Sequence, residues 1–270
     1  MCSGCTSLRW FILIRADAAP AGFSPEYVRV EAHDSTLVAG AVQPACLPAR
    51  AGSYILDRML FDPATGDVFL DVFDGAPLRQ LRAGEILFHA GSEADYVFNI
   101  VSGTLMATRI GMDGRRQVLS FLFRDNFVGL SASNTYFFTV EAVTAATVAC
   151  RPRRALETRL ETDPQAERAF LHMVLRVFEN SLDLVYSLGQ RTAVERLAVF
   201  LLYLRNRQRI ATGLPESAPE LALIELPMSR QDMADFLGLK KETVSRSFTQ
   251  LDTRGLITRP DNLHARITRL

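Results

Sequence analysis

The segment from Met228 to Leu251 constrains the fold most, because its pattern predicts two short helices joined by a tight turn. Ser229 is a favourable N-cap residue, and Asp232 three positions later resembles the second member of a capping box. The first helix is therefore expected to start after Ser229 and to end before the turn at Gly238 and Leu239. Apolar residues on both helices would lock the pair together: Ala234, Phe236, Leu237, Val244, Phe248 and Leu251.

The second of these helices carries three polar side chains on one face. Glu242, Ser245 and Arg246 stand at positions i, i+3 and i+4, which lie together on a helix surface. Arg246 can donate two hydrogen bonds to guanine, Glu242 can accept one from the cytosine amino group, and Ser245 can reach base edges. The alternative is a solvated face on which Glu242 and Arg246 form a salt bridge. A helix-turn-helix with such a face favours sequence-specific binding of double-stranded DNA.

Charge is distributed unevenly, although the whole chain is formally neutral. Residues 191–270 contain 13 Lys and Arg against 9 Asp and Glu, which gives +4, whereas residues 1–190 contain 17 against 21, which gives −4. A mildly basic carboxyl-terminal part is compatible with contacts to phosphate groups. The residues that we expect to contact phosphates without reading sequence are Arg230, Lys240, Lys241, Arg254 and Arg259.

The middle of the chain alternates short apolar segments with glycine turns from about Asp67 onward. Asp113–Gly114, between two such segments, is a strong hairpin signal. Regularly spaced short strands with glycine turns predict a small β-barrel or β-roll. The expected strands cover residues 68–73, 82–88, 96–101, 104–110, 117–123, 137–143 and 147–150.

A long helix is expected to follow Pro164, from Gln165 to about Gln190. One apolar stripe on it has the 4-3 spacing of a two-stranded coiled coil, with the members Phe170, Val174, Val177, Ser181, Leu184 and Leu188. A neighbouring stripe is also apolar, with the members Leu171, Leu175, Phe178, Leu182 and Val185. We expect the first stripe to form the seam of a homodimer and the other to pack on the roll. The alternative packs both stripes inside one core.

These patterns predict an α+β chain with four parts. Residues 1–58 repeat Ala, Pro and Gly without a lasting period, and they form an N-terminal extension whose order the pattern does not predict. Residues 59–164 are the expected cupin-like β-roll, and residues 165–190 are the dimerisation helix. Residues 191–270 are expected to form a helix-turn-helix domain that closes with a β-hairpin wing.

The order of a β-roll, a long helix and a winged helix-turn-helix, over about residues 60–270, resembles the Crp/Fnr superfamily of bacterial transcription regulators. The segment 242–246, Glu-Thr-Val-Ser-Arg, matches the recognition-helix motif of its Fnr and FixK branch. Ala83–Phe88, Ile100–Gly103 and Phe137–Val143 are similar to that branch's roll, which is built like a cyclic-nucleotide-binding domain. The resemblance implies a homodimer that binds an inverted repeat such as TTGAT-N4-ATCAA and acts on transcription.

The resemblance also implies a contact with RNA polymerase, and the sequence departs from the family pattern at one position. The hairpin with Asp113, Arg115 and Arg116 corresponds to a loop that contacts RNA polymerase in relatives, and the alternative is an ordinary surface hairpin. Lys240 departs from the pattern, because many relatives have a Ser or Thr N-cap at this position. The second helix is therefore expected to start less firmly.

The input signal is the part of the resemblance that the residues define least. Cyclic-nucleotide binders of the superfamily have a Gly-Glu pair for the ribose and a downstream Arg for the phosphate. Here Leu130 follows Gly129, and no Arg occurs between Asp125 and Cys150. An anionic phosphate without a cationic partner would be held poorly. These residues argue against cyclic AMP or GMP, and also against a nucleotide-binding module without DNA readout.

An iron–sulfur cluster is the second candidate for the signal. A 4Fe–4S cluster needs four thiolates, and the chain has four cysteines: Cys2, Cys5, Cys46 and Cys150. Oxygen-sensing relatives pack three cysteines close together, whereas Cys46 here is forty residues from Cys5. The cofactor therefore stays open between an oxygen-sensing cluster and none, as in a FixK-like regulator controlled by its abundance or by thiol oxidation.

The residues disfavour an enzyme and a membrane protein. A cupin-like enzyme needs a cluster of His and carboxylate metal ligands, yet His89 is the one histidine in the predicted roll. We find no glycine-rich phosphate loop and no paired nucleophile and base, so we expect no enzyme activity. No apolar run reaches the roughly 18 residues that a membrane span requires. We therefore expect a cytoplasmic protein.

Overall fold

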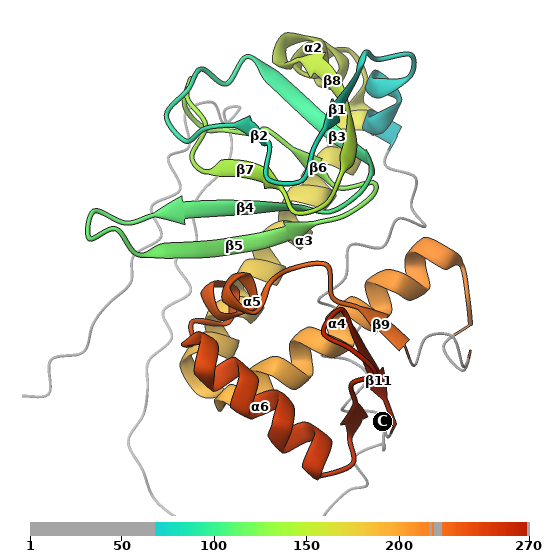
Figure 1. Cartoon of the computed structure of the whole chain (residues 1–270). Coiled ribbons are helices and arrows are strands. Elements are labelled where there is room, and N and C mark those ends of the chain that lie inside the picture. The colour runs from blue at the N-terminus through green and yellow to red at the C-terminus, as the bar shows by residue number, and fades with distance from the viewer. Residues whose placement is uncertain (1–67, 216–217, 219–222, 269–270) are drawn as a thin grey trace, which may run out of the picture. The chain divides into compact units, whose positions relative to one another are not determined.

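The computed structural model describes residues 68–215, 218 and 223–268 (Figure 1). Residues 78–152 form a roll of two antiparallel four-stranded sheets, with the strand orders β1-β8-β3-β6 and β2-β7-β4-β5. The sheets enclose an apolar core that includes Ile100, Leu105 and Val148, none of which has exposed surface. The predicted β-roll is therefore confirmed. Its strands are β1 (Leu78–Leu81), β2 (Ile86–Phe88), β3 (Tyr96–Ser102), β4 (Leu105–Ile110), β5 (Arg116–Leu122), β6 (Phe127–Val128), β7 (Thr139–Ala142) and β8 (Ala146–Pro152).

Two glycines explain the turns on either side of β4. Gly103 joins β3 to β4 with φ +84°, and a Cβ atom there would lie 2.4 Å from the carbonyl oxygen of Ala145. Only glycine combines this backbone conformation with so close an approach. At the other end, Gly114 with φ +77° forms the turn between β4 and β5. The hairpin predicted from Asp113–Gly114 is thus confirmed.

The first described element corrects a sequence prediction. The segment Val68–Phe73 was expected to be a strand, but it forms a 3-10 helix, η1. A strand would point Phe69, Asp71 and Phe73 to the same side and bury the carboxylate. In the helical turn Phe69 and Phe73 are buried, whereas Asp71 is exposed and pairs with Arg159 at 2.8 Å. The charged residue therefore decides against the strand.

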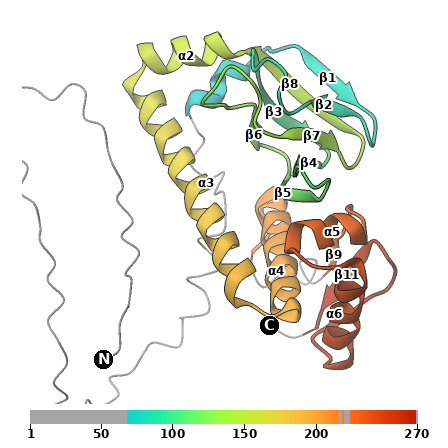
Figure 2. The same ribbon diagram turned by 90° about the vertical axis from the view of Figure 1, so that its left-hand side faces the viewer.

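Two helices follow the roll. Helix α2 (Arg153–Thr162) was not predicted, because half of its residues are charged and only Leu156 is buried. Helix α3 (Pro164–Gln190) agrees with the predicted long helix and extends away from α2 (Figure 2). Its N-cap, Asp163, accepts a hydrogen bond from the backbone N–H of Gln165 at 2.8 Å. This bond and the Arg159 guanidinium hold the pKa of the Asp163 carboxyl below its usual value.

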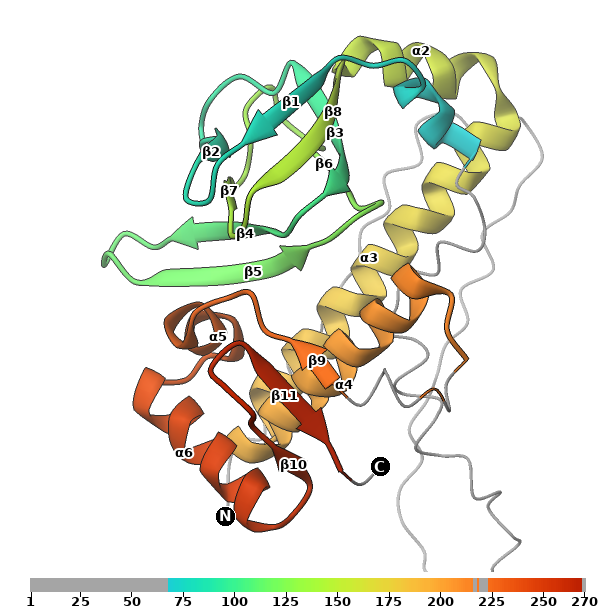
Figure 3. The same ribbon diagram turned by 45° about the vertical axis from the view of Figure 1, so that its right-hand side comes forward.

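The remaining elements form a winged helix-turn-helix (Figure 3). Helix α4 begins at a capping box between Thr192 and Glu195 and ends at Gly213 in the left-handed conformation. A three-stranded antiparallel sheet in the order β10-β11-β9 forms the wing. The predicted helix pair and wing are confirmed. These elements are α4 (Ala193–Thr212), β9 (Leu223–Glu225), α5 (Arg230–Leu237), α6 (Lys241–Thr253), β10 (Ile257–Thr258) and β11 (His264–Ile267).

One apolar cluster joins the helix-turn-helix to the roll. Phe200 on α4, Phe236 on α5 and Phe121 on β5 meet in it, with ring centroids 5.2 to 5.7 Å apart. Phe121 is only 1% exposed. The helix-turn-helix is therefore docked on the roll by a shared apolar core. Within the described residues, the structure has no helix that is long and apolar enough to cross a membrane.

Candidate nucleic-acid interface

The first helix of the pair begins and ends as its residues predict. Ser229 accepts a hydrogen bond from the N–H of Asp232, and the Asp232 carboxylate accepts one from the N–H of Ser229, both at 3.1 Å. This reciprocal capping box satisfies two otherwise free N–H groups at the start of α5. Gly238 ends α5 with φ +62°, and a Cβ atom there would lie 3.2 Å from Cδ2 of Leu188. The turn is therefore fixed by backbone geometry and by contact with α3.

Helix α6 has one buried face and one free face. Val244, Ser247, Phe248 and Leu251 are buried on it. Lys240 is the N-cap residue and makes no side-chain capping bond, as expected from its departure from the family pattern. The helix is therefore held by its packing on α4 and α5 and not by its cap.

The three predicted reading residues all lie on the free face of α6. Glu242, Ser245 and Arg246 are exposed, and Arg246 donates one hydrogen bond to Thr243 Oγ1 at 3.3 Å. In the described part of the chain, no ion pair joins Glu242 to Arg246, so the salt-bridge alternative is not what this structure contains. Ser245 donates a hydrogen bond to the carbonyl oxygen of Lys241 at 3.2 Å. The carboxylate and the guanidinium are thus free to meet a partner.

Two predicted phosphate contacts lie together beside α6. The Arg230 guanidinium lies 3.8 Å from the centroid of the Phe248 ring, and that of Arg259 lies 5.6 Å from the same ring. Burial, together with the charge of Arg259, lowers the pKa of Arg230. Nη2 of Arg230 and Nε of Arg259 are buried without a hydrogen-bond partner. Because the two neighbouring guanidiniums repel each other, a nearby anion would stabilise them.

The other predicted phosphate contacts are exposed at the two ends of α6. Lys240 and Lys241 stand at its amino-terminal end, and Arg254 stands at its carboxyl-terminal end. None of the three makes a salt bridge within the described residues. Together with Arg230 and Arg259, they surround the reading face with positive charge.

The three residues predicted to contact RNA polymerase, Asp113, Arg115 and Arg116, have different surroundings in the β4–β5 hairpin. Asp113 and Arg115 are exposed near its tip and pair with each other at 2.5 Å. Arg116 instead points to α5, where its Nε donates to Asp235 Oδ2 at 2.7 Å and its Nη2 donates to Asp232. Arg116 is therefore already engaged within the chain. Asp232 and Asp235 share one face of α5, but no sequence pattern indicates that Arg116 is their partner.

The structure divides the predicted seam residues of helix α3 into two groups: Val174 and Val177 are exposed, whereas Phe170, Leu184 and Leu188 are partly buried. Phe170, which was predicted in the dimer seam, packs edge-on against Phe69 at 5.4 Å. Leu184 and Leu188 are half-buried, and Leu188 contacts the turn at Gly238. The neighbouring stripe, expected on the roll, is exposed. Its members Leu171, Leu175, Phe178, Leu182 and Val185 are between 49% and 65% exposed, and Val174 and Val177 at 37% and 51% lie beside them.

Comparisons with known proteins agree with this architecture. Residues 195–270 match the Crp-like helix-turn-helix domain family, and residues 78–163 match the cyclic nucleotide-binding domain family. The nitrogen fixation regulation protein FixK of Bradyrhizobium diazoefficiens is 34% identical over 193 residues, which cover 68% of this chain and 79% of that protein. The transcriptional activator protein FnrL of Cereibacter sphaeroides is 32% identical and covers 70% of this chain and 76% of its own.

A solved structure agrees as well. FixK2 from Bradyrhizobium japonicum superimposes with a TM-score of 0.65 at 30% identity, covering 72% of this chain and 93% of that one. This chain belongs to the Crp/Fnr family. It is a transcription regulator of the FixK-like branch with a helix-turn-helix DNA-binding domain, and it is not an enzyme.

Gly129 and Leu130 stand where cyclic-nucleotide binders of the superfamily have the Gly-Glu pair for the ribose. A Cβ atom at Gly129 would lie 2.8 Å from the carbonyl oxygen of Tyr96, so this glycine serves the close packing of the two strands. Leu130, at the position of the expected ribose-binding Glu, packs against the apolar cluster that contains Phe69. The residues at this position therefore form apolar packing where the nucleotide binders have a carboxylate.

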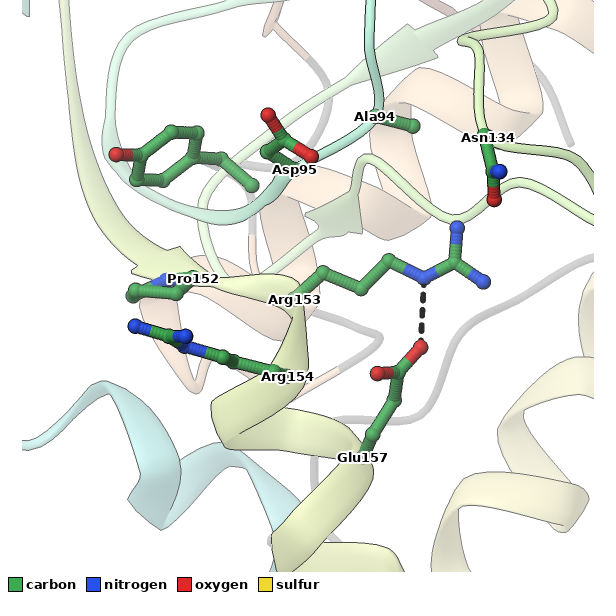
Figure 4. Close-up of a pocket in the computed structure, with 8 residues that line it drawn as sticks. Ala94, Asp95, Asn134, Pro152, Arg153, Arg154 and Glu157 are labelled. Carbon is green, nitrogen blue, oxygen red and sulfur yellow. Dashed lines mark hydrogen bonds and ion pairs between the residues drawn. The ribbon is translucent and has the colours of Figure 1, made fainter.

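An open pocket of about 430 Å³ lies on the roll at the start of α2 (Figure 4). Arg153 lines it and is already engaged, because its Nε donates to Glu157 at 2.8 Å and its Nη1 donates to the carbonyl oxygen of Ser133 at 3.1 Å. Arg154 and Asp95 also line the pocket. Charges of both signs share these walls, so the pocket lacks the cationic character that a phosphate would need.

Of the four cysteines considered as ligands of an iron–sulfur cluster, only Cys150 lies within the described residues. Cys2, Cys5 and Cys46 lie outside the described residues. Cys150 is half-buried on β8 against the roll core, and burial raises the pKa of its thiol, an effect that Arg79 partly offsets. Among the described residues, no group of three or more His, Cys, Asp or Glu side chains could hold a metal ion. Cys150 alone thus behaves as a small apolar residue.

Proposed function

We propose that this regulator activates transcription by binding, as a homodimer, to an inverted repeat that resembles TTGAT-N4-ATCAA. The observation that carries the proposal is the free face of α6, on which Glu242, Ser245 and Arg246 are exposed and the two charged groups do not pair with each other. A carboxylate, a hydroxyl and a guanidinium in this arrangement complement base edges in a major groove. The relatives FixK and FnrL support the regulatory role, and FnrL is named an activator.

Contacts to the DNA backbone would place this face in the groove. Arg230 and Arg259 lie beside the same Phe248 ring, and a phosphate group of the DNA would offset the repulsion between their charges. Lys240, Lys241 and Arg254 extend the positive surface along both ends of α6. Such contacts fix the position of the domain on the duplex and carry no sequence information.

The homodimer would form through the exposed stripe on α3. Its large apolar side chains are spaced by three, four and seven residues, which matches the seam of a two-stranded coiled coil. Leu171, Phe178 and Val185 occupy one heptad position, and Val174 and Leu182 flank it. In this arrangement residues 59–164 are the sensory roll and residues 165–190 are the dimerisation helix. Two parallel copies of α3 would place two α6 helices on successive half-sites.

RNA polymerase would contact the tip of the β4–β5 hairpin. Asp113 and Arg115 are exposed there, and the side chain of Met112 between strands is fully exposed. Arg116 already donates to Asp235 on α5, so we place the proposed contact at Asp113 and Arg115. We expect the input to require no cyclic nucleotide. A 4Fe–4S cluster on the four cysteines remains the alternative, and anaerobic purification followed by iron and sulfide assays decides between it and a cluster-free, FixK-like regulator.

A mobility-shift titration tests the DNA-binding proposal. The probe is a duplex with TTGAT-N4-ATCAA, and the two controls carry one scrambled half-site or two. We expect a single retarded complex with the intact repeat and much weaker binding to both controls. Equal binding to all three duplexes would mean that the protein does not read this sequence.

Lys241→Ala tests the backbone contacts. Removing one phosphate contact per protomer should weaken binding to all sequences alike and lower the salt dependence of log K by about one unit per protomer. The measurement is the slope of log K against log salt concentration, and Lys241→Arg, which keeps the charge, is the matched control. An unchanged slope for the alanine variant would remove Lys241 from the phosphate contacts.

A further inference from the structure

A partly buried arginine, Arg116, forms ion pairs that connect the roll to α5, the first helix of the helix-turn-helix. Arg116 on β5 reaches Asp235 at 2.7 Å and also pairs with Asp232, across more than 115 residues of sequence. All three side chains are largely shielded, at 31%, 13% and 14% exposed for Arg116, Asp235 and Asp232. Burial acts to lower the pKa of Arg116, but the bonds to both aspartates outweigh it and raise the pKa. This arginine therefore stays charged and joined to α5.

Apolar and polar contacts beside the pair act on the same helix. Phe121, five residues after Arg116 on β5, packs on Phe236 with ring centroids 5.4 Å apart. Nε2 of Gln117 donates to the carbonyl oxygen of Phe236 at 3.4 Å. Strand β5 and helix α5 lie side by side in all three ribbon views (Figure 3). Strand β5 thus contacts α5 through an ion pair, an amide hydrogen bond and an aromatic contact.

A second arginine holds the other end of α5. Arg196 on α4 donates from Nη1 to the carbonyl oxygen of Leu237 at 2.9 Å and from Nη2 to that of Leu188 at 2.6 Å. Leu188 belongs to the last turn of α3, the helix that carries the exposed apolar stripe. Helix α5 is therefore held along one face by β5, and its last residue is joined through Arg196 to the end of α3.

A third contact joins α4 to the turn after β5. Arg207 is only 8% exposed, and its Nη2 donates to the carbonyl oxygen of Arg124 at 3.3 Å. Its guanidinium also lies 5.4 Å from the centroid of the Phe123 ring. Both helices that support α6 are thus held by the same edge of the roll.

We propose that Arg116 is a positioning residue that sets the orientation of α6 and thereby the spacer length between the two half-sites. The inference rests on the proposed function, because it needs a dimer on an inverted repeat. Each added base pair moves a half-site by about 3.4 Å along the duplex and rotates it by about a tenth of a turn. Two α6 helices whose orientation relative to α3 is fixed therefore match one spacer, whereas loosely held helices accept several.

The variants must separate positioning from folding. Arg116→Gln removes the charge and leaves two shielded carboxylates unpaired. Arg116→Asp adds a third carboxylate, and the double variant Arg116→Asp with Asp235→Arg restores one ion pair in reverse. Asp232 is left unchanged because it also caps α5 through Ser229. Arg79→Gln is the matched control, since it removes an arginine from an exposed ion pair with Glu85 within the roll.

The test is fluorescence anisotropy with duplexes that keep both TTGAT half-sites and have spacers of three, four or five base pairs. We expect the wild type and Arg79→Gln to prefer one spacer by about tenfold or more, which is roughly 1.4 kcal/mol. Arg116→Gln should reduce this preference at least severalfold, Arg116→Asp should reduce it further, and the double variant should recover it. Thermal unfolding and sedimentation confirm that each variant is folded and dimeric. If Arg116→Gln does not fold, Asp235→Asn is used in its place.

Two outcomes would overturn the inference. A folded, dimeric Arg116→Gln with the wild-type spacer preference would show that the pair does not set spacing. Equal loss of affinity on all three duplexes, with the preference intact, would assign Arg116 to stability alone. Failure of the wild type to bind any of the three duplexes is distinguishable from both, because it would overturn the proposed function and this inference with it.

Discussion

Phe178→Asp will convert the protein to a monomer and remove its tight binding to the inverted repeat. Phe178 is 59% exposed at the centre of the apolar stripe on α3, and Leu171 and Val185 stand one heptad away on either side. A carboxylate in the seam would be buried without a partner in the dimer, whereas in a monomer it is solvated. The loss of the second half-site should weaken binding by roughly 100- to 10,000-fold.

His172→Asp is the matched control for this prediction. It places the same carboxylate on the same helix, at an exposed position outside the stripe. Sedimentation velocity gives the oligomeric state, and anisotropy with the intact repeat gives the affinity. We expect a dimer with unchanged affinity for His172→Asp and a monomer for Phe178→Asp. A Phe178→Asp protein that still sediments as a dimer would mean that this stripe is not the seam.

The sequence predicts the helix-turn-helix well because its determinants are local. Ser229 and Asp232 form a capping box within four residues, and Gly238 ends the helix with a backbone conformation that glycine prefers. The reading face follows from the same local rule, since residues three and four apart share one side of a helix. Hence Glu242 and Arg246 are exposed as predicted, with no knowledge of the rest of the chain.

The stripes of α3 show where periodicity stops being informative. Both stripes are apolar, so the pattern predicts two partners but not which partner each stripe meets. Phe170 packs on the roll because Phe69 and Phe127 approach it, and η1, which carries Phe69, was itself expected to be a strand. The spacing of apolar residues on α3 therefore does not determine by itself which stripe faces a second copy of the chain.

Long-range contacts of charged residues were equally inaccessible. Arg116 follows a hairpin turn, where a charged side chain ordinarily reaches solvent, and only the fold brings Asp235 to 2.7 Å from it. The same holds for the two guanidiniums beside the Phe248 ring. Arg230 and Arg259 are far apart in the sequence, and only the fold brings them to one ring. Residue type identified these arginines as functional, but the choice between a partner in the chain and a partner outside it needed the tertiary structure.

Arg246→Ala is expected to remove most of the discrimination between the cognate repeat and scrambled DNA. Loss of a bidentate contact to guanine costs about 1–3 kcal/mol in each half-site, so a dimer loses about 2–6 kcal/mol on the cognate site. Arg246 is exposed and its one hydrogen bond, to Thr243, is local to α6. Alanine favours helix, so the fold and the dimer should be unaffected.

Arg254→Ala is the control variant that distinguishes a contact to a base from a contact to a DNA phosphate. Arg254 follows α6 directly and is exposed, and we expect its loss to weaken binding to cognate and scrambled duplexes by the same factor. Arg246→Ala should instead weaken cognate binding selectively and relax the preference at one base pair per half-site. The measurement is anisotropy at one fixed salt concentration with a panel of single-base substitutions. If both variants lose affinity equally on every duplex, Arg246 contacts the backbone, and the base contact must be sought at Glu242 or Ser245, its two neighbours on the free face.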